Sequence, residues 1–510
     1  MRGMSNFQWS LATNVLALLI IPIVTAIVCY NVRNARVVGY VSLAGAVVLA
    51  FFAFPVVAAS IAAPVSALNE TFSMDALSGY IMALVILLSL ASAVYSIGYL
   101  EHEFESGLTS PRGVRTYYGL FHLFIFTMLL VTMANNLAVM WIGIEATTIV
   151  SALLIGLGFH KRPLAVEAAW KYIILCTVGI TFALLGTFIA YYASTAVLGT
   201  EGALNWTVLR GVAHRLNPET MKLAFIFALV GYGTKAGLAP VHNWLPDAHS
   251  QAPSPISALL SGILLNTAFY GIMRFVSIVE PSTGSAFTGN LLIIFGLISV
   301  GISSVFILVQ DNFKRLLAYS SIEHMGIISL GIGIGGPAGL YGALLHILNH
   351  ALSKPLMFFA SGKIQSRFGT TNIANVNGVL SSMPLLGTLT FIGALSLSGT
   401  PPFNIFVSEF TVLKAGVDRG LWPVVALFLV FVVIVFYGVL SGFGKMLFGK
   451  AGEPPTAQAG PHQAPGFNAG DLLGNAVMIA MAVSVIVLGF TVPGFIDSTI
   501  MACVQVLGAK

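Results

Sequence analysis

Five charged side chains stand in stretches of the sequence that are otherwise apolar. They are Glu145, Lys235, Glu323, Lys354 and Glu409. Only 8% of the residues are charged and 57% are hydrophobic. An ionisable group at membrane depth costs about 2.5–3.5 kcal/mol or more, so it usually serves a function. Because several such groups follow one another along the chain, we expect a path for protons or other ions rather than a single binding pocket.

The first two of these charges form a natural pair. Glu145 lies near the middle of the apolar run NNLAVMWIGIEATTIVSALL, and Lys235 lies in GYGTKAGLAP. An isolated carboxylate at that depth would simply take up a proton, whereas a lysine partner would keep it charged. A Glu145–Lys235 pair that opened would let the lysine release a proton, so it would act as a switch. The alternative is a static buried ion pair that fixes helix register. The ionisable groups further along the chain favour the switch.

Histidines extend the series beyond Lys235. His242 and His249 follow within the next fifteen or so residues, and Glu323 and His324 are neighbours in LLAYSSIEHMG. Histidine suits proton relay because it titrates nearest to neutral pH. For His242 and His249, a position at the membrane interface is the alternative.

A polar stripe follows on one later span. His346, His350 and Lys354 are spaced by four residues in LHILNHALSKPLMFF, which places them on one face of a helix. Such a stripe on an apolar helix predicts a wet, inward-facing lining. His346 and His350 could together hold a metal. We expect none, because no carboxylate shares that helix.

Glu409 and Lys171 complete the set of candidate residues. Glu409 ends the series, directly after the sequence GTPPFNIFVS. Lys171 lies near one end of an earlier span and is either a proton-uptake group or a lysine that reaches the membrane surface along its apolar stem.

The sequence offers no ligand set for a cofactor. Its three cysteines, Cys29, Cys176 and Cys503, form no CxxC pair, and neither a dinucleotide-binding glycine pattern nor a P-loop is present. We therefore expect no cofactor bound by this chain and no redox chemistry of its own.

The elements that must position these residues are membrane-spanning helices. Apolar runs of about 20 residues recur along the chain, long enough to cross a bilayer as helices. We predict an all-α polytopic membrane protein in which residues 1–510 form one transmembrane domain of about 14 spans. The expected spans are 11–30, 37–58, 76–99, 117–134, 137–158, 170–195, 221–247, 253–276, 289–309, 314–333, 338–361, 383–415, 422–447 and 473–496.

The seventh and twelfth expected spans are interrupted. Pro240 and Pro246 break the first of them, and Pro401 and Pro402 break the second. Paired broken helices at corresponding positions mark the site in many transporters. Because the two breaks lie five spans apart, we predict two inverted five-helix repeats, spans 4–8 (117–276) and spans 9–13 (289–447). Ordinary proline kinks are the alternative.

Basic residues predict the orientation. Loops after odd-numbered spans carry most of the lysine and arginine, which indicates the cytoplasmic side. They are Arg33, Arg36, Arg112, Arg115, Lys161, Arg162, Lys314, Arg315, Lys363, Arg367, Lys445 and Lys450, against Arg210, Arg215, Lys222, Arg274 and Arg419 on the other side. Both termini are then expected outside a bacterial cytoplasmic (inner) membrane. The net charge of +5 reflects this bias and does not indicate nucleic-acid binding.

Several of these motifs resemble one protein superfamily. The stretches NNLAVMWIGIEATTIVSALL, GYGTKAGLAPVHNWLPDAHSQAPSPISALLSGILL, LLAYSSIEHMG and NHALSKPLMFFASG are similar to the antiporter-like proton-pumping membrane subunits. That superfamily includes complex I membrane-arm subunits, Mrp cation/proton antiporters and energy-converting [NiFe] hydrogenases. AAWKYIILCTVGI and YSSIEHMG look most like component F of hydrogenase-4 and formate hydrogenlyase. The similarity runs from about the fourth to the thirteenth span.

The resemblance implies roles for matching residues. Glu145 and Lys235 correspond to the family's Glu–Lys pair, His350 and Lys354 to polar residues of the eleventh helix, and Glu409 to the terminal group of the twelfth. Asn266 stands where many relatives have a central lysine, and asparagine does not carry a proton. Water, His242 or Glu323 would have to bridge that position, or conduction is poor.

Three functions are consistent with this pattern. The first is a proton-translocating subunit of a membrane redox complex, most simply a group 4 [NiFe]-hydrogenase or hydrogenlyase. Neighbouring antiporter-like, membrane-anchor and peripheral hydrogenase-type subunits would be its partners, and some of them would carry the [NiFe] and iron–sulfur centres. The second is an Mrp-like Na⁺/H⁺ antiporter subunit or a complex I membrane-arm subunit. The third is a membrane scaffold without net transport, which Asn266 keeps open.

Overall fold

The computed structural model describes residues 2–156, 163–448 and 469–508, and nearly all of them are helical. The elements are α1 (Arg2–Asn31), α2 (Val37–Ala62), β1 (Val65–Ala67), β2 (Phe72–Met74), α3 (Ala76–Glu105), α4 (Pro111–Met133), α5 (Leu137–Gly156), α6 (Pro163–Leu198), α7 (Trp206–Val212), η1 (Ala213–Arg215), α8 (Pro218–Ala236), α9 (Trp244–Gln251), α10 (Ser254–Leu259), η2 (Leu260–Leu264), α11 (Leu265–Thr283), α12 (Ser285–Leu308), α13 (Phe313–Ile334), α14 (Gly336–Phe368), η3 (Ile373–Asn375), α15 (Val379–Ser382), α16 (Pro384–Leu397), α17 (Asn404–Asp418), α18 (Trp422–Phe448), α19 (Ala469–Phe490) and α20 (Gly494–Val506). β1 and β2 pair antiparallel as one short hairpin.

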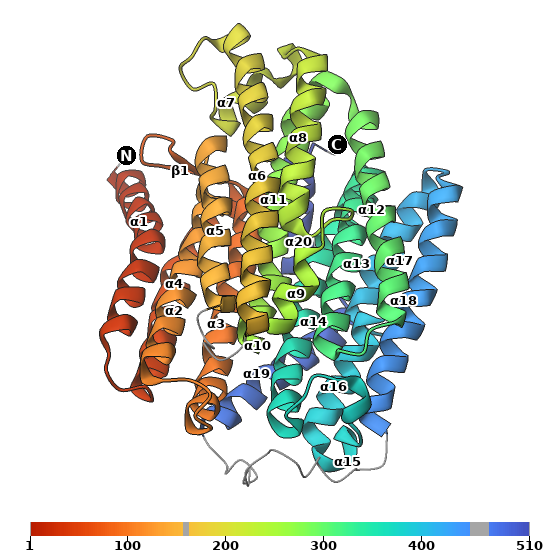
Figure 1. Ribbon diagram of the computed structural model, residues 1–510. Coiled ribbons are helices and arrows are strands. Elements are labelled where there is room, and N and C mark those ends of the chain that lie inside the picture. The colour runs from red at the N-terminus through yellow and green to blue at the C-terminus, as the bar shows by residue number, and fades with distance from the viewer. Residues whose placement is uncertain (1, 157–162, 449–468, 509–510) are drawn as a thin grey trace.

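The helices stand side by side in a bundle, with α1, α2 and α4 at one edge and α18 at the other (Figure 1). α14 lies between these edges and packs against α10, α13, α16, α17 and α19. The first helix begins and α20 ends on the side that carries β1 and α7, as Figure 1 shows. Arg210 of α7 confirms the second placement, because it donates a hydrogen bond of 2.6 Å to the Val506 carbonyl.

The prediction of a polytopic helical membrane protein is confirmed. In the described part of the chain, eleven helices are long and apolar enough to cross a bilayer. The other expected crossings are α8 with α9, α16 with α17, and α14. At 33 residues, α14 is about 50 Å long and can span the hydrocarbon core despite its polar stripe. α20 is an additional short helix that the sequence did not predict separately.

Both predicted helix breaks are present. α8 ends at Gly237, which takes the left-handed conformation (φ +78°) that glycine adopts without strain, and α9 begins seven residues later. α16 and α17 are separated by a turn in which Gly399 also has positive φ (+66°). Each break holds a cis X–Pro bond, Ala239–Pro240 and Pro401–Pro402. The limits of the two inverted repeats remain a prediction.

The polar helices occupy the centre of the bundle. α10–α11 and α13 are buried almost all round, whereas α1, α2 and α18 expose most of their surface. A helix buried on all sides can present polar groups to its neighbours without meeting lipid. Between α10 and α11, residues Leu260–Leu264 form one turn of π-helix directly before Asn266, a feature often found at functional sites.

Several of the charges predicted in loops lie inside helices, and two of those in the described residues are buried. Arg274 is inside α11 and Lys314 is in the first turn of α13, and both side chains are buried. Each was counted as a loop charge because its position within an apolar run is ambiguous to a few residues. Lys161, Arg162 and Lys450 lie outside the described residues.

Candidate functional site

Lys235 occupies the last turn of the half-helix α8, and its side chain is fully buried. A helix C-terminus carries unpaired carbonyls and a partial negative charge, which favours a cation there. Its Nζ donates to Thr148 Oγ1 of α5 at 2.9 Å and also to the hydroxyl of Tyr172 on α6. Tyr172 in turn contacts Ser151 Oγ at 2.7 Å. The break in the helix therefore places a desolvated lysine among hydroxyl groups.

Glu145 reaches Lys235 through a threonine rather than directly. Its Oε1 accepts a hydrogen bond from Thr177 at 2.8 Å, and its Oε2 accepts one from Thr148 at 3.4 Å. The predicted direct ion pair is absent between these two described side chains. Thr148 accepts from Lys235 and donates to Glu145, so one hydroxyl joins the base to the acid.

Lys171 lies at the surface, half-exposed, in a chain of ion pairs. Its Nζ is 2.7 Å from Glu167 and 3.4 Å from Asp247, and Arg315 binds the other oxygen of Asp247. This network connects α6, α9 and α13. The sequence pattern did not single out Asp247, although its motif WLPDAHSQAPSP is unusually polar for a span.

His249 lies in α9, beyond Lys235 along the chain. It is fully buried, its ring stacks on Phe358 at 5.4 Å, and Trp244 separates it from Tyr172. Neither ring nitrogen has a protein hydrogen-bond partner among the described residues. His242, also buried, lies in the break itself, and its Nδ1 has no hydrogen-bond partner among the described residues.

Asn266 and His350 meet between α11 and α14. Asn266 Nδ2 donates to the Gly262 carbonyl at 2.8 Å and lies 3.5 Å from His350 Nδ1. Asn266 Oδ1 and His350 Nε2 have no protein partner in the described structure. Buried polar atoms of this kind are commonly satisfied by ordered water.

A chain of imidazoles leads from His350 toward α17. The ring centres of His350 and His324 are 5.4 Å apart. His324 Nδ1 lies 3.1 Å from His346 Nε2, and His346 Nδ1 lies 2.9 Å from Ser408 Oγ. The predicted inward stripe is present, because His346, His350 and Lys354 are all fully buried.

Among the described residues, Lys354 forms its hydrogen bonds with α13 and not with the imidazoles. Its Nζ donates to the Leu317 carbonyl at 3.0 Å and to the hydroxyl of Ser320, both on α13. Within the described chain it forms no ion pair with either glutamate of the central region. Like Lys235, it is a buried ammonium solvated by hydroxyl and carbonyl oxygens.

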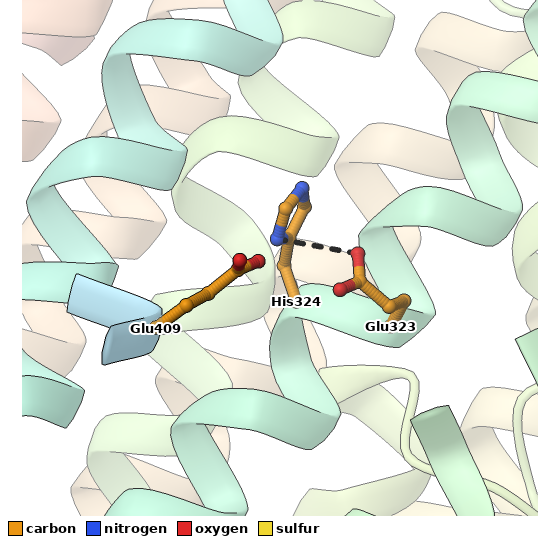
Figure 2. Close-up of side chains that lie close together, drawn as sticks. All are labelled: Glu323, His324 and Glu409. Carbon is orange, nitrogen blue, oxygen red and sulfur yellow. Dashed lines mark ion pairs between the residues drawn. The ribbon is translucent and has the colours of Figure 1, made fainter. Parts of the chain in front are cut away.

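Glu323 and Glu409 come together at the far end of this chain. Figure 2 shows their carboxylates on either side of the His324 ring. Glu323 Oε2 is 3.3 Å from His324 Nδ1, and one ligand atom from each of the three residues lies within 4.8 Å of the others. The Glu409 carboxylate lies against Gly399, where any side chain would collide with it. The second helix break therefore makes room for Glu409.

The structure also contains a buried ion pair that the sequence did not reveal. Arg274 of α11 binds both oxygens of Asp75, at 2.6 and 2.7 Å, and stacks on Trp206 at 4.1 Å. It also donates to Ser78, whose hydroxyl is 3.0 Å from Tyr270. Asp75 precedes α3 as its N-cap, so neither its burial nor its partner follows from local pattern.

Comparison with known proteins agrees with this arrangement. Residues 134–435 match the family model described as NADH:quinone oxidoreductase/Mrp antiporter, transmembrane region. The chain belongs to this family. The match covers both broken helices and every candidate site residue from Glu145 to Glu409. The protein is therefore an antiporter-like, multi-pass membrane subunit of the complex I, Mrp and hydrogenase group.

Individual relatives show which kinds of protein in this family are similar to the chain. The chain is 40% identical over 385 residues to a hydrogenase-4 component F homolog of Methylacidiphilum infernorum, covering 75% of this chain and 79% of the relative. It is similar to a chain of the archaeal membrane-bound sulfane sulfur reductase, with a TM-score of 0.82 and 25% identity over 97% of this chain and 98% of the other. A chain of the Mrp complex of Dietzia sp. DQ12-45-1b matches with a TM-score of 0.83 and 21% identity, and 98% of each chain is covered. The resemblance to hydrogenase-4 component F is thereby confirmed.

Proposed function

We propose that this antiporter-like subunit translocates protons for a membrane-bound redox complex, most simply a group 4 [NiFe]-hydrogenase or hydrogenlyase. The 40% identity to a hydrogenase-4 component F homolog supports the choice of complex. In this proposal the redox centres belong to partner subunits, the chain lies in a bacterial inner membrane, and both termini are outside.

The observation that carries the proposal is a series of polar groups through the bundle, which starts at the half-buried Glu145 and is otherwise buried. It begins with Glu145, Thr148 and Lys235, and it ends with His324, His346 and Glu409. Keeping so many ionisable groups at membrane depth is costly, and a purely structural role would not require them in a line. Proton relay does require it, because each transfer spans only a hydrogen bond or one water.

Between the two ends the series relies on neutral groups. His249, Asn266 and His350 each have a polar atom without a protein partner in the described structure. Water bound at those atoms would join the Lys235 group to the imidazoles, and Asn266 would then position water instead of carrying a proton. A change in a neighbouring subunit that moved Glu145 or Thr148 would shift the proton affinity of Lys235 and so drive the transfer.

The test is redox-driven proton movement in liposomes that contain the complex purified through a tag on this chain. Lys235→Ala is compared with Lys222→Ala on the same helix, where the lysine is partly exposed and pairs with Glu219. We expect hydrogenase-type subunits to co-purify, Lys235→Ala to abolish proton movement and Lys222→Ala to leave it intact. Unchanged pumping in Lys235→Ala would make Lys235 structural and remove this path.

An Mrp-like Na⁺/H⁺ antiporter subunit is the second candidate, which the Mrp chain of similar fold favours. In that case the chain would purify without redox subunits or with small antiporter subunits. The liposomes would then exchange Na⁺ for H⁺ with no redox substrate present.

A further inference from the structure

The cluster of Glu323, His324 and Glu409 contains two carboxylates but no contacting lysine or arginine. Lys354, the nearest candidate by its electrostatic influence, donates to a carbonyl and a hydroxyl instead. Among the described residues, no ammonium or guanidinium group forms an ion pair with either glutamate. Two carboxylates in a region of low dielectric repel strongly when both are ionised. The cluster therefore needs a proton or another cation to neutralise it.

The carboxylates of the cluster face His324 through its Nδ1, which also lies 3.1 Å from His346 Nε2. Glu323 Oε2 and His324 Nε2 have no hydrogen-bond partner in the described structure, and both residues are at least 99% buried. Figure 2 shows the Glu409 carboxylate, the His324 ring and the Glu323 carboxylate turned toward one another. These side chains come from α13 and α17, which are far apart in the sequence.

The chemistry of these donors selects the type of cation. Carboxylate oxygens alone suit Na⁺, Ca²⁺ and Mg²⁺, but imidazole nitrogen favours first-row transition metals and zinc. Two carboxylates and one imidazole match the ligand types of zinc sites, and two negative charges balance one divalent ion. A further imidazole is within reach, because His346 Nε2 lies 3.1 Å from His324 Nδ1.

We propose that Glu323, His324 and Glu409 form a binding site for a divalent transition-metal ion such as Zn²⁺, with His346 as the nearest additional ligand. The three ligand atoms now lie within 4.8 Å of one another. Ligand atoms around a tetrahedral zinc are about 3.3–3.6 Å apart, given metal–ligand distances of about 2.0–2.2 Å. Closing the site requires side-chain rotations that move the ligand atoms by about 1 Å. His324 Nδ1 and His346 Nε2, at 3.1 Å, are already close to that separation.

This site would act as a block on the proton path, and that part of the inference rests on the proposed function. Zinc would displace the proton from the carboxylates and occupy the imidazole that links His346 to Glu323. It would also tie α13 to α17 next to the second helix break. Glu409, which retains 7% of its surface, is the member through which the ion would reach the site.

The binding experiment uses the purified complex, first stripped of metal by a chelator. Zn²⁺ alone is titrated and bound equivalents are counted, and Co²⁺ alone is used to record visible absorption from a four- or five-coordinate ion. We expect His324→Gln to lose one equivalent, with affinity lower by at least about tenfold, and to lose the Co²⁺ absorption. His214→Gln, at an exposed histidine of η1, should match the wild type. A His324→Gln complex that keeps the equivalent and the absorption overturns the proposal.

A second variant covers the case in which His324→Gln does not assemble. Glu409→Gln keeps the size and shape of the side chain while it removes the charge of one ligand, so we expect it to fold. It should lose the same equivalent, with the exposed Glu219→Gln as its control. Retention of zinc in Glu409→Gln also overturns the metal site.

Proton movement by the wild-type complex then separates the two proposals. Binding together with inhibition by Zn²⁺ supports both. Binding without inhibition keeps the metal site and removes this cluster from the proton path. Absence of binding removes the metal site and leaves the proposed function untouched.

Discussion

At the scale of single residues, hydroxyl groups hold the two buried lysines. Lys235 rests on Thr148 and Tyr172, and Lys354 rests on Ser320 and a backbone carbonyl. Neither ammonium is locked in a direct carboxylate pair among the described residues. A lysine solvated by neutral groups loses its proton more readily than one paired with an anion, which suits a group that must release a proton in each cycle.

The threonine between Glu145 and Lys235 gives the sharpest residue-scale prediction. Thr148→Val keeps the shape of the side chain but removes the hydroxyl that accepts from Lys235 and donates to Glu145. We expect redox-driven proton movement to fall by at least about tenfold, equivalent to about 1.4 kcal/mol in the barrier. The measurement is the initial rate of proton uptake into liposomes per redox turnover.

Thr181→Val is the matched control for Thr148→Val. Thr181 donates only to the backbone carbonyl of Thr177 on its own helix and is exposed. Its rate should equal that of the wild type. Equal rates for both variants would show that the hydroxyl of Thr148 does not link the acid to the base.

Sequence reasoning found the chemistry of the site but not its contacts. Glu145, Lys235 and Glu409 stand out by their cost in an apolar run, which is a local property. The bridging role of Thr148 depends on the rotation of α5 relative to α8, which a sequence pattern does not contain. The sequence predicts no metal site because no carboxylate shares the helix of His346. The proposed site would instead take its carboxylates from α13 and α17.

At the scale of elements, a buried ion pair between Asp75 and Arg274 joins the start of α3 to α11. Arg274→Met would leave Asp75 as a buried charge without its main partner, which costs about 3–5 kcal/mol. We expect a clear fall in the thermal unfolding midpoint of the detergent-solubilised chain. Asp75→Asn in the same background should recover part of the loss, because it removes the orphaned charge.

The exposed pair Lys222–Glu219 provides the comparison for Arg274→Met. Exposed pairs contribute about 0–1 kcal/mol, so Lys222→Met should shift the midpoint little. If Arg274→Met and Lys222→Met shifted the midpoint equally, the Asp75–Arg274 pair would not be what holds α3 against α11.

α13, which carries Glu323 and His324, packs closely against α12 through a contact between two glycines. A Cβ at Gly296 would lie 2.8 Å from the Gly326 carbonyl oxygen, and one at Gly326 would lie 2.9 Å from the Gly296 carbonyl oxygen. Small residues allow this backbone approach, which drives helix association in lipid. Gly296→Leu should therefore destabilise the protein by about 1–3 kcal/mol or more through overpacking.

The same substitution at a glycine with free space is the control. Gly444 of α18 has no atom within 4 Å of an added Cβ. Gly444→Leu should leave the unfolding midpoint in detergent near that of the wild type. A similar fall for both variants would mean that side-chain size on these helices, and not the α12–α13 contact, sets the response.

At the scale of the whole molecule, the two ends of the helix bundle carry different elements and different numbers of basic residues. The side with β1 and α7 also carries the start of α1 and the end of α20 (Figure 1). The opposite side has more of the exposed basic residues, including Arg33 and Arg367. The positive-inside rule predicts that this opposite side faces the cytoplasm and that both described ends of the chain face outward.

Single cysteines test this orientation directly in cells. Arg33→Cys and Glu201→Cys both place a thiol at an exposed position, one on each side of the bundle. The native Cys29, Cys176 and Cys503 are all buried, so they should not react and need no replacement. A membrane-impermeant maleimide should label Glu201→Cys in spheroplasts and Arg33→Cys only after the membrane is permeabilised. The reverse pattern would invert the topology. Both described ends of the chain would then face the cytoplasm.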